Sequence, residues 1–450
     1  MEGKGTPRDM AEAIVRTLRS AGYEAYFVGG CVRDLVLGRQ PGDYDIVTSA
    51  LPADVQALFP VTYPVGASFG VVLVVVEGRP FEVATYRKED AYLDGRRPSV
   101  VTFGSLEEDV RRRDFTVNGL VLDPETDRII DLVGGLDDIH RRVLRTIGTA
   151  EERFAEDRLR MLRAARFAAN LAFDLDGEAL DAIRTQAKAI HRISAERIRE
   201  ELTKLLKRPG ARRGLEWLEA TGLLEELLPE VGALRGVEQP PAFHPEGDVW
   251  AHTLGMLELL HEGGGQDADP RLAWAALLHD VGKAVTRTED GQGVRFYGHV
   301  EKGVAIAAAV LQRLKFSNAD TETILALIGQ HMRFMHVRDM RPSTLKRFLR
   351  QPDFDLHLAL HRLDCLGSHG LLENHVYCRE ALAVLPEESL RPPRLLTGED
   401  LIALGLAPGP LFREILAAVE DAQLNGEIGD PEQARAWVRA RWGALPQLLP

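Results

Sequence analysis

The stretch Gly29–Asp45 constrains the fold of this chain more than any other. A short apolar segment, residues 24–28, leads into two glycines, and a second short apolar run follows them. This order predicts a strand, a tight turn and one or two helical turns. Because glycine has no side chain, the backbone N–H groups of such a turn can approach a phosphate. The pattern therefore predicts a phosphate site at the glycine pair, which Arg33 and Asp34 flank.

Two carboxylates end this stretch. Asp43 and Asp45 stand two positions apart at the head of the apolar pair Ile46–Val47. Side chains at this spacing point to the same face of a strand. Paired carboxylates suit Mg²⁺, which keeps water and substrate phosphates as its remaining ligands. A glycine pair and an Asp-x-Asp pair are each common in turns and loops, so the specific signal is their combination in this order.

Composition places the chain among ordinary globular proteins. Its 450 residues are 45% hydrophobic and 27% charged, enough for about two to four domains with apolar cores. The net charge of −13 argues against a protein that coats nucleic acid indiscriminately, but it permits local basic patches. The three cysteines show no paired or zinc-type spacing, and no apolar run is long enough to span a bilayer. The sequence therefore predicts a cytoplasmic protein with no membrane partner.

Local patterns predict the elements around these motifs. An amphipathic helix is expected over residues 9–21, with Asp9 as its N-cap. Two apolar runs, 69–76 and 80–86, flank a Glu-Gly turn and predict a β-hairpin. Glu82 lies in the second of these strands. A carboxylate there is usually an outward-facing surface group; the alternative is a third metal ligand or a support for the metal site.

An arginine-rich motif follows the hairpin. Residues 87–102 are polar and contain glycine and proline, which predicts a mobile loop. The segment 106–118 then begins as a helix with Asp and Arg repeating along one face. A salt-bridged surface helix would explain these charges, but it leaves Asn118 and the pair Arg112–Arg113 unexplained. Arginines suit a triphosphate because each guanidinium binds phosphate oxygens bidentately.

From residue 150 to the end of the chain, no strand is predicted. Residues 156–167 predict a helix on which Asp157 and Arg160 share a face. Such a pair is commonly a surface ion pair; alternatively, a carboxylate and a guanidinium on one edge can hydrogen-bond a nucleobase. A second helix is expected over residues 194–206, with the leading serine as its N-cap.

Four groups of residues occur in a fixed order along the first half of the chain. They are Gly29-Gly30-x-x-Arg33-Asp34 with Asp43-x-Asp45; Asp109 with Arg112-Arg113-Asp114 and Asn118; Glu156-Asp157-x-x-Arg160; and Arg197 with Glu200-Glu201 and Lys204. In this order they resemble the motifs of the class II tRNA nucleotidyltransferases and of the bacterial poly(A) polymerases built on the same head.

This resemblance implies roles for the matching residues. Asp43 and Asp45 are expected to hold two Mg²⁺ ions that activate the RNA 3′-hydroxyl and stabilise the leaving pyrophosphate. Asp157 and Arg160 are expected to pair with the base edge of incoming CTP or ATP, so that protein replaces a nucleic-acid template. In all, the residues predicted to contact the nucleotide are Gly29, Gly30, Arg33, Asp34, Arg112, Arg113, Asp114, Asn118, Asp157, Arg160, Arg163 and Arg166.

The loop over residues 87–102 separates subtypes of this family. In enzymes that add all of CCA the loop helps the switch from CTP to ATP, whereas enzymes that add only CC lack it. Its presence here argues against CC-only addition. Enzymes that add only the terminal A, and poly(A) polymerases, keep the loop and remain alternatives.

A second constellation begins after Pro240–Pro241. It consists of recurring histidines and aspartates: His252, His279, Asp280, His299, His331 and Asp364. A lone histidine on a helix is more often a core or surface residue than a ligand. An adjacent His-Asp pair with a distant His before it and a distant Asp after it is rarer, and imidazole and carboxylate ligands suit transition metals.

This second pattern resembles the HD-superfamily metal-dependent phosphohydrolases over residues 240–370. His252, His279, Asp280 and Asp364 match the core pattern, and His299 and His331 resemble the extra ligands of its two-metal members. Some nucleotidyltransferases with this appendage act as phosphodiesterases on 2′,3′-cyclic ends. A degenerate, purely structural domain is the alternative to metal binding.

The two resemblances imply an α+β fold with a small N-terminal nucleotidyltransferase β-sheet head, followed by an all-α neck, body and HD-type helical domain. The expected domains are 1–147 (head), 148–236 (neck, nucleotide recognition and tRNA binding), 237–380 (HD-type metal-binding domain) and 381–450 (helical tail).

The predicted function is template-independent addition of CCA to the 3′ end of tRNA from CTP and ATP, with Mg²⁺ in the head and a transition metal in the HD domain. The closest rivals are an A-adding enzyme and a poly(A) polymerase. A rival of a different class is a phosphodiesterase that processes RNA ends. A non-catalytic RNA-binding module is disfavoured by the acidic net charge. The sequence leaves the oligomeric state open.

Overall fold

The computed structural model describes residues 5–64, 70–89, 101–241, 244–262, 267–291 and 293–442. The chain divides into two compact units. The first comprises residues 1–232 with the short segments 265–267 and 313–315, and the second comprises the rest. Most of the loop predicted over residues 87–102 lies outside the described residues, and the finer division into four domains stays a prediction.

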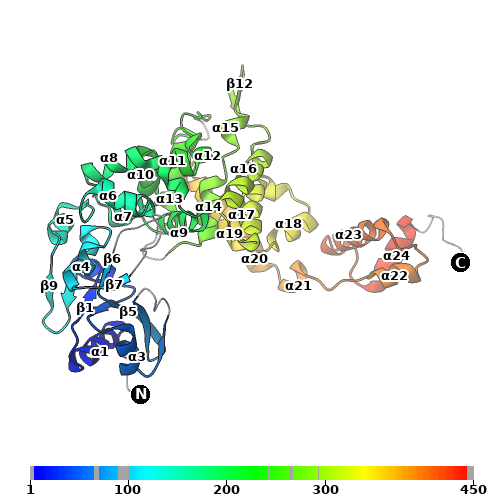
Figure 1. The fold of residues 1–450 in the computed structure, drawn as a ribbon. Helices are drawn as coiled ribbons and strands as arrows, with labels where there is room; N and C mark the ends of the chain where they lie inside the picture. The colour runs from blue at the N-terminus through cyan, green and yellow to red at the C-terminus, as the bar shows by residue number, and fades with distance from the viewer. Residues whose placement is uncertain are drawn as a thin grey trace. The chain divides into compact units, whose positions relative to one another are not determined.

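The first unit contains a sheet of seven strands in the order β3-β4-β5-β2-β1-β8-β9 (Figure 1). All neighbouring strands in it are antiparallel except β2 and β5, which are parallel. The strands are β1 (Ala25–Val28), β2 (Asp45–Thr48), β3 (Thr62–Tyr63), β4 (Val71–Val76), β5 (Arg79–Thr85), β8 (Val121–Asp123) and β9 (Arg128–Ile130). This mixed sheet is the predicted head.

The predicted hairpin is confirmed over its described residues. β4 and β5 pair in antiparallel fashion, with Val76 opposite Arg79. The two residues between them, Glu77 and Gly78, both have positive φ, as a tight two-residue hairpin turn requires.

Helices make up most of the rest of the first unit. They are α1 (Pro7–Ser20), α2 (Gly30–Val36), α3 (Pro52–Leu58), α4 (Leu106–Arg111), η2 (Thr116–Asn118), α5 (Gly135–Arg141), α6 (Ala150–Glu156), α7 (Leu159–Leu171), α8 (Gly177–Gln186), η3 (Ala187–Arg192), α9 (Ala195–Leu206), α10 (Ala211–Ala220), α11 (Leu223–Leu227) and α12 (Pro229–Gly232). Two short pairs of strands accompany them: β6 (Arg87–Glu89) with β7 (Val101–Phe103), and β10 (Val143–Leu144) with β11 (Asp174–Leu175).

The second unit is helical apart from one short hairpin among its described residues. Its elements are α13 (Val249–Leu259), α14 (Pro270–Leu278), α15 (Lys283–Thr286), β12 (Thr288–Asp290), β13 (Gly293–Arg295), α16 (His299–Arg313), α17 (Asn318–Gln330), η4 (His331–Asp339), α18 (Pro342–Leu349), α19 (Phe354–Leu366), α20 (Glu373–Val384), α21 (Glu387–Leu390), α22 (Gly398–Ala403), α23 (Pro410–Leu424) and α24 (Pro431–Trp442). An aromatic cluster around Phe334 and Phe348 forms one core, and the last three helices pack around Leu401 and Ile415.

Two local predictions were wrong. Thr6, not Asp9, caps α1: the Thr6 hydroxyl accepts from the Asp9 N–H, and the Asp9 carboxylate accepts from the Thr6 N–H. In such a capping box the acidic residue stands at the third helical position. Strands also occur beyond residue 150, at β11, β12 and β13. They are two or three residues long, too short for an alternating pattern to reveal them.

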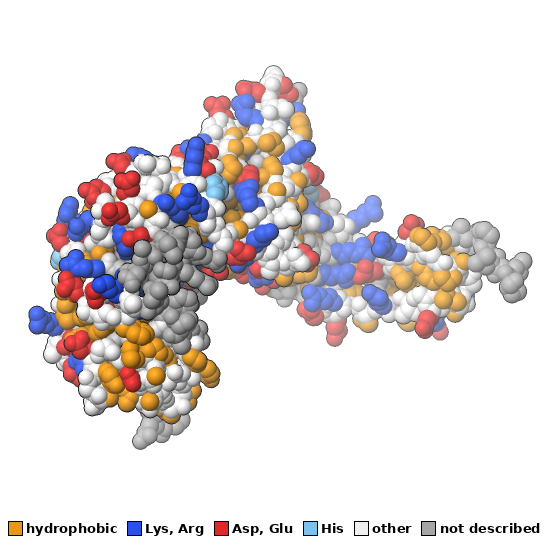
Figure 2. All heavy atoms as spheres, in the orientation of Figure 1, with side chains coloured by type: hydrophobic (Ala, Val, Ile, Leu, Met, Phe, Trp, Pro, Cys, Tyr) orange, Lys and Arg blue, Asp and Glu red, His pale blue; other side chains and the backbone are white. Residues whose placement is uncertain are grey.

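Among the described residues, no helix has the length and apolar character needed to cross a membrane. On the face shown in Figure 2, Lys and Arg side chains lie among Asp and Glu side chains over much of the helical part. On this face the basic side chains are therefore interspersed with acidic ones.

A buried ion pair joins α7 to α9. The Arg166 Nε donates to the Glu201 Oε2 over 2.6 Å, and both side chains are buried. Burial alone raises the pKa of Glu201, but the nearby Arg166 and Arg163 guanidiniums lower it below its usual value. Glu201 is therefore charged at neutral pH and compensates a buried cation.

We expect Glu201→Ala to lower the free energy of unfolding by about 3–5 kcal/mol, because it leaves Arg166 buried without its counter-ion. Glu200 stands next to it on α9 and is exposed. Glu200→Ala should change stability by less than about 0.5 kcal/mol. Urea denaturation of both variants measures the difference, and equal losses would show that the buried pair does not stabilise the packing.

Candidate nucleotide site and candidate metal centre

A cavity of about 450 Å³ in the first unit gathers most of the predicted nucleotide contacts. Its lining residues are Gly29, Gly30, Arg33, Asp43, Asp45, Arg112, Arg113, Asp114, Asn118, Asp157, Leu159, Arg160, Arg163, Phe167 and Arg197. Asp34 and Arg166, also predicted to contact the nucleotide, do not line it. Asp34 accepts from the neighbouring Arg33 guanidinium, and Arg166 is buried against Glu201.

The glycine turn between β1 and α2 lines this cavity. Gly29 has a φ of +79°, a backbone conformation that favours glycine, and it occupies the N-cap position of α2. A Cβ at Gly29 would lie 3.1 Å from the Arg113 Nη1. Glycine is therefore needed here both for the turn and for the close approach of an arginine.

The Arg33 guanidinium begins a chain of hydrogen bonds across one wall. Its Nη1 donates to the Asn118 Oδ1 over 2.6 Å, and the Asn118 Nδ2 donates to the Asp114 Oδ1 over 3.0 Å. Arg163 donates to the other oxygen of Asp114 through Nε and Nη2, over 2.9 and 2.6 Å. Burial alone would raise the pKa of Asp114, but the Arg163 charge lowers it to about 2. Asp114 thus remains an anion that orients Arg163.

Asp109 holds the Arg112–Arg113 pair. Its side chain is fully buried, and its Oδ1 accepts from Arg112 Nε and Nη2 over 2.9 and 2.7 Å. Its Oδ2 accepts from Arg113 Nη2 over 3.1 Å. Both guanidiniums are therefore oriented by one carboxylate, and both line the cavity.

The helix predicted over residues 156–167 is interrupted at Asp157. α6 ends at Glu156, Asp157 is extended (φ −136°, ψ 105°), and α7 begins at Leu159. The Asp157 Oδ1 accepts from the Leu159 N–H, and its Oδ2 accepts from Arg197 Nη2, each over 3.0 Å. Asp157 and Arg160 thus line the same cavity from the start of α7, not from two successive turns of one helix.

Two carboxylates of the predicted metal site line the same cavity. Asp43 precedes β2 and Asp45 is its first residue. Ile46 pairs with Val83 across β2 and β5, so Asp45 and Glu82 stand one residue before this pair on adjacent strands. Burial, followed by the charges of Asp43 and Glu82, raises the pKa of Asp45 to about 6. Such mutual repulsion is typical of a site built for a cation.

The second unit brings together all six residues of the second constellation. His252 comes from α13, His279 and Asp280 follow α14, His299 begins α16, His331 begins η4, and Asp364 lies on α19. Their ring centroids form a chain: His252 to His279 and His279 to His331 are both 5.4 Å apart, and His299 to His331 is 5.7 Å. Asp280 and Asp364 stand beside these rings.

The histidines are oriented through their Nδ1 atoms. Each of three lies close to a backbone carbonyl: His279 to Ala276, His299 to Phe296 and His331 to Ile328, over 2.7–3.0 Å. If Nδ1 carries the proton, Nε2 is left with a lone pair. The His331 Nε2 is 3.8 Å from the Asp280 Oδ1, and the His252 Nε2 is 3.2 Å from Asp364. Metal-ligating histidines show this division between their two nitrogens.

Several atoms in this cluster are buried and available. His299 Nε2 and Asp280 Oδ1 have no hydrogen-bond partner among the described residues, and His279 Nε2 lies 3.1 Å from the other oxygen of Asp280. Burial alone would raise the pKa of Asp280, but His279 and Lys283 lower it well below its usual value. Burial and the nearby His279 lower the pKa of His331 to about 4. An anionic carboxylate beside a neutral imidazole is a donor set that fits a divalent transition metal.

Three comparisons with known proteins bear on this geometry. The family described as "Poly A polymerase head domain" matches residues 25–145, "Probable RNA and SrmB- binding site of polymerase A" matches residues 172–234, and "HD domain" matches residues 249–353. The CCA-adding enzyme of Geobacillus stearothermophilus is 36% identical over 97% of each chain. That of Streptococcus gordonii is 47% identical over 97% of this chain and 98% of its own.

The protein belongs to the family of CCA-adding enzymes.

Solved structures agree with this assignment. The CCA-adding enzyme of Bacillus stearothermophilus in complex with CTP superposes with a TM-score of 0.76 at 32% identity, over 97% of this chain and 98% of that one. A Thermotoga maritima CCA-adding enzyme complexed with tRNA shares the fold at 18% identity, with a TM-score of 0.55 over 96% and 94% of the two chains. The predicted α+β fold with a nucleotidyltransferase head and helical domains is thereby confirmed.

Three residues that line the nucleotide cavity, Leu159, Phe167 and Arg197, were not among the predicted nucleotide contacts. The guanidiniums of Arg33, Arg163 and Arg166 lie 5.4, 5.2 and 4.1 Å from the ring centroid of Phe167. Only the place of Leu159 and Phe167 next to the arginines of α7 could have marked them in the sequence.

The metal centre also contains residues that the sequence reading missed. Glu246 Oε1 lies 2.9 Å from the Nδ1 atoms of both His244 and His252. The ligand atoms of these three side chains lie within 4.8 Å of one another. Among the described residues, two further groups meet the same distance. They are His252, His279 and Asp280, and Asp280, His299 and His331. Asp43, Asp45 and Glu82 form no such group, so the ligand role of Glu82 stays a prediction.

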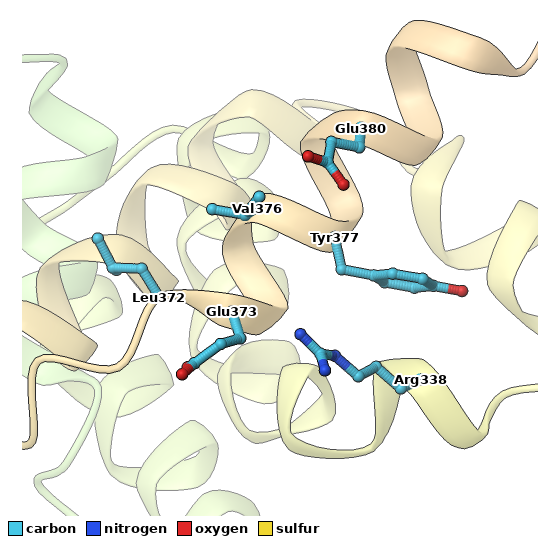
Figure 3. Close-up of a pocket in the computed structure, with 6 residues that line it drawn as sticks. All are labelled: Arg338, Leu372, Glu373, Val376, Tyr377 and Glu380. Atoms are coloured by element: carbon cyan, nitrogen blue, oxygen red, sulfur yellow. The ribbon is translucent and has the colours of Figure 1, made fainter.

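A larger cavity, of about 620 Å³, lies elsewhere in the second unit. Figure 3 shows Arg338 of η4 pointing toward α20, which with its N-cap Leu372 supplies the other lining residues. The Arg338 guanidinium is 5.9 Å from the Tyr377 ring centroid. None of the predicted site residues lines this cavity.

We expect Asp45→Asn to stabilise the metal-free protein at pH 8 by about 1–2 kcal/mol. The pKa of Asp45 is about 6 in the folded protein, above the value of about 3.9 in unfolded chains. The ionised Asp45 carboxylate therefore lowers the free energy of unfolding, and it does so fully above pH 6. This loss of stability disappears as the pH falls below 4, where the carboxyl group is protonated in both states. Thermal unfolding in EDTA at pH 8 and pH 4 measures the change.

Magnesium provides the control for this prediction. Adding Mg²⁺ should raise the melting temperature of the native protein but not that of Asp45→Asn, because only the folded native site binds the ion. A gain in stability that is the same at both pH values would show that charge repulsion at Asp45 is not its cause.

Proposed function

We propose that the protein adds the 3′-terminal CCA to tRNA from CTP and ATP without a nucleic-acid template, releasing pyrophosphate. The observation that carries this proposal is the N-terminal cavity, in which arginines for a triphosphate, a carboxylate pair for a metal, and Asp157 with Arg160 all meet. CCA-adding enzymes with 36% and 47% identity match nearly the whole chain. We place this activity in the cytoplasm; the buried, free state of its three cysteines supports a reducing compartment.

The chemistry of Asp157 and Arg160 accounts for a choice between bases. Each Asp157 oxygen accepts one hydrogen bond from the protein and keeps a further lone pair. Cytosine and adenine both present an amino donor beside a ring-nitrogen acceptor, whereas uracil and guanine present the reverse order. A fixed carboxylate next to a guanidinium therefore accepts C and A and leaves unpaired groups with U and G.

The triphosphate would lie against the arginines and the glycine turn. Arg112 and Arg113 are each held by Asp109 and line the cavity, where guanidiniums suit phosphate oxygens. Asp43 and Asp45 would hold Mg²⁺, whose preference for carboxylate oxygens fits this pair. Bound there, the ion supplies positive charge for the attacking RNA 3′-oxygen and the leaving pyrophosphate. Glu82, an exposed residue of β5, remains a candidate third carboxylate or a surface group.

Extension of three labelled tRNAs tests this function. They end at the discriminator base, at C and at CC, and each is incubated with CTP, with ATP and with both. We expect full CCA on the bare tRNA only with both nucleotides. Asp45→Ala should reduce extension more than about 100-fold, and Asp280→Ala should leave it unchanged.

Other outcomes would contradict the proposal in distinct ways. One A on the CC-ended tRNA with no use of CTP would indicate an A-adding enzyme. Long A tails on any RNA would indicate a poly(A) polymerase. Undiminished extension by Asp45→Ala would show that the metal site has been misplaced.

We propose a second activity for the metal centre of the second unit, a metal-dependent hydrolysis of phosphodiesters. The buried His299 Nε2 and Asp280 Oδ1, which have no hydrogen-bond partner among the described residues, favour it over a purely structural domain. Asp280 belongs to two of the three ligand groups, so it would be a ligand in either of them if metal were bound. Bound metal would supply an activated water and a Lewis acid for the phosphate.

Gly282 provides a sharp test of this centre. A Cβ at Gly282 would lie 2.0 Å from the carbonyl oxygen of His299. Gly282→Ala should therefore displace the start of α16 and weaken binding of Mn²⁺ by about 10–100-fold. Gly291→Ala is the matched control, because nothing lies within 4 Å of a Cβ there.

Titration calorimetry with Mn²⁺ and hydrolysis of 2′,3′-cyclic AMP measure these effects. Native protein that binds no metal would indicate a degenerate, structural domain. Unchanged Mn²⁺ affinity in Gly282→Ala would exclude His299 from the ligand set.

A further inference from the structure

The Arg153 side chain joins the arginine motif to the start of α7. Arg153 lies on α6, and its Nη2 donates to the carbonyl oxygens of Arg112 and Arg113 over 2.5 and 2.7 Å. Its Nη1 donates to Glu156. Only 11% of the side chain is exposed. A guanidinium that donates twice to successive backbone carbonyls fixes the course of the chain between them.

Arg160 reaches the same backbone from the other side of the α6–α7 break. Its Nη2 donates to the Arg112 carbonyl over 3.3 Å, and its Nη1 donates to the Arg153 carbonyl and to Glu156 over 3.1 and 2.6 Å. Three of its five N–H donors are thus used by the protein, and two remain for a ligand. We call the two guanidiniums of Arg153 and Arg160, with the carbonyls of Arg112 and Arg113, the carbonyl clamp.

The clamp acts on residues whose side chains are already held. Asp109 fixes the guanidiniums of Arg112 and Arg113, whereas the clamp fixes their backbone. If a bound base displaces Arg160, the hydrogen bond from Arg160 to the Arg112 carbonyl changes with it. Without Arg153, the carbonyls of Arg112 and Arg113 would each lose this donor, and the Arg160 contact to the Arg112 carbonyl is the longer one, at 3.3 Å.

We propose that Arg153 is a positioning residue that couples base selection by Asp157 and Arg160 to triphosphate binding by Arg112 and Arg113. This proposal rests on the proposed nucleotidyltransfer. It assigns to Arg153 no contact with the nucleotide. Its effect is to make the affinity for the triphosphate depend on whether the base has paired correctly.

The test compares Arg153→Met, Arg153→Lys and Arg158→Met. Methionine keeps the apolar stem and removes every donor, whereas lysine keeps a cation that can reach a carbonyl. Arg158 is the matched control: it lies at the same break, but it donates to Gln186. Extension of the CC-ended tRNA gives KM and kcat for ATP, and the tRNA ending at C gives them for CTP and for UTP.

We expect Arg153→Met to raise the KM for ATP and CTP about 10-fold or more and to lower the CTP-over-UTP preference by a similar factor, with a smaller change in kcat. Arg153→Lys should restore part of both, and Arg158→Met should match the native protein. An unchanged preference in Arg153→Met, or the same loss in Arg158→Met, would overturn the proposal. So would a failure of lysine to restore either quantity.

Equilibrium binding separates this result from a failure of the proposed function. Titration of the native protein and Arg153→Met with CTP and with UTP measures the coupling without any extension of tRNA. Native protein that extends no tRNA yet binds CTP more tightly than UTP would contradict the proposed function alone. If Arg153→Met prefers CTP over UTP by the same factor as the native protein, the proposed role of Arg153 is contradicted. Thermal unfolding of the variants shows whether a lost preference reflects lost folding.

Discussion

A guanidinium that leaves water loses several kcal/mol of hydration, and only a well-placed anion or carbonyl group offsets that loss. The nucleotide cavity is built under this constraint. Asp109 pairs with Arg112 and Arg113, Asp114 with Arg163, and Glu201 with Arg166. Arg112, Arg113 and Arg163 line the cavity and are fixed in direction by their carboxylates, whereas Arg166 is buried against Glu201 and does not line it. The Asp114–Arg163 pair joins the arginine-rich motif to α7, and the Arg166–Glu201 pair joins α7 to α9. The same contacts therefore stabilise the unit and fix the geometry of its site.

In the candidate metal centre of the second unit, histidines take the place that arginines have in the nucleotide cavity. A histidine can be held through one nitrogen and present the other, and here backbone carbonyls lie close to Nδ1 of His279, His299 and His331. The carboxylates of Asp280 and Asp364 then stand among imidazoles, not among guanidiniums. Carboxylates alone suit Mg²⁺, and carboxylates with imidazoles suit transition metals. The two sites of this chain thus differ in donor chemistry, which would let each retain its own metal in one solution.

Much of the fold and of the candidate site could be predicted because their signals are local. The glycine turn, the two aspartates two positions apart and the adjacent His279–Asp280 are readable from a few neighbouring residues. What could not be predicted depends on segments that are distant in sequence. The break at Asp157 is stabilised by Arg197, the need for glycine at 282 arises from the carbonyl of His299, and Phe167 becomes part of a cavity wall through Arg33. A periodicity of apolar residues contains none of these contacts.

In the proposed reaction, Asp157 and Arg160 would not by themselves determine whether C or A is added. Their donors and acceptors suit cytosine and adenine equally, since both bases present an amino group beside a ring acceptor. A switch from C to A must therefore change the position of these side chains or the room beside them. Arg160 is held by Glu156, by the Arg153 carbonyl and by the Arg112 carbonyl. A movement that suits the larger base must alter at least one of these contacts. Because the Arg112 carbonyl is shared with Arg153, such a movement also reaches Arg112 and Arg113, the arginines proposed to bind the triphosphate.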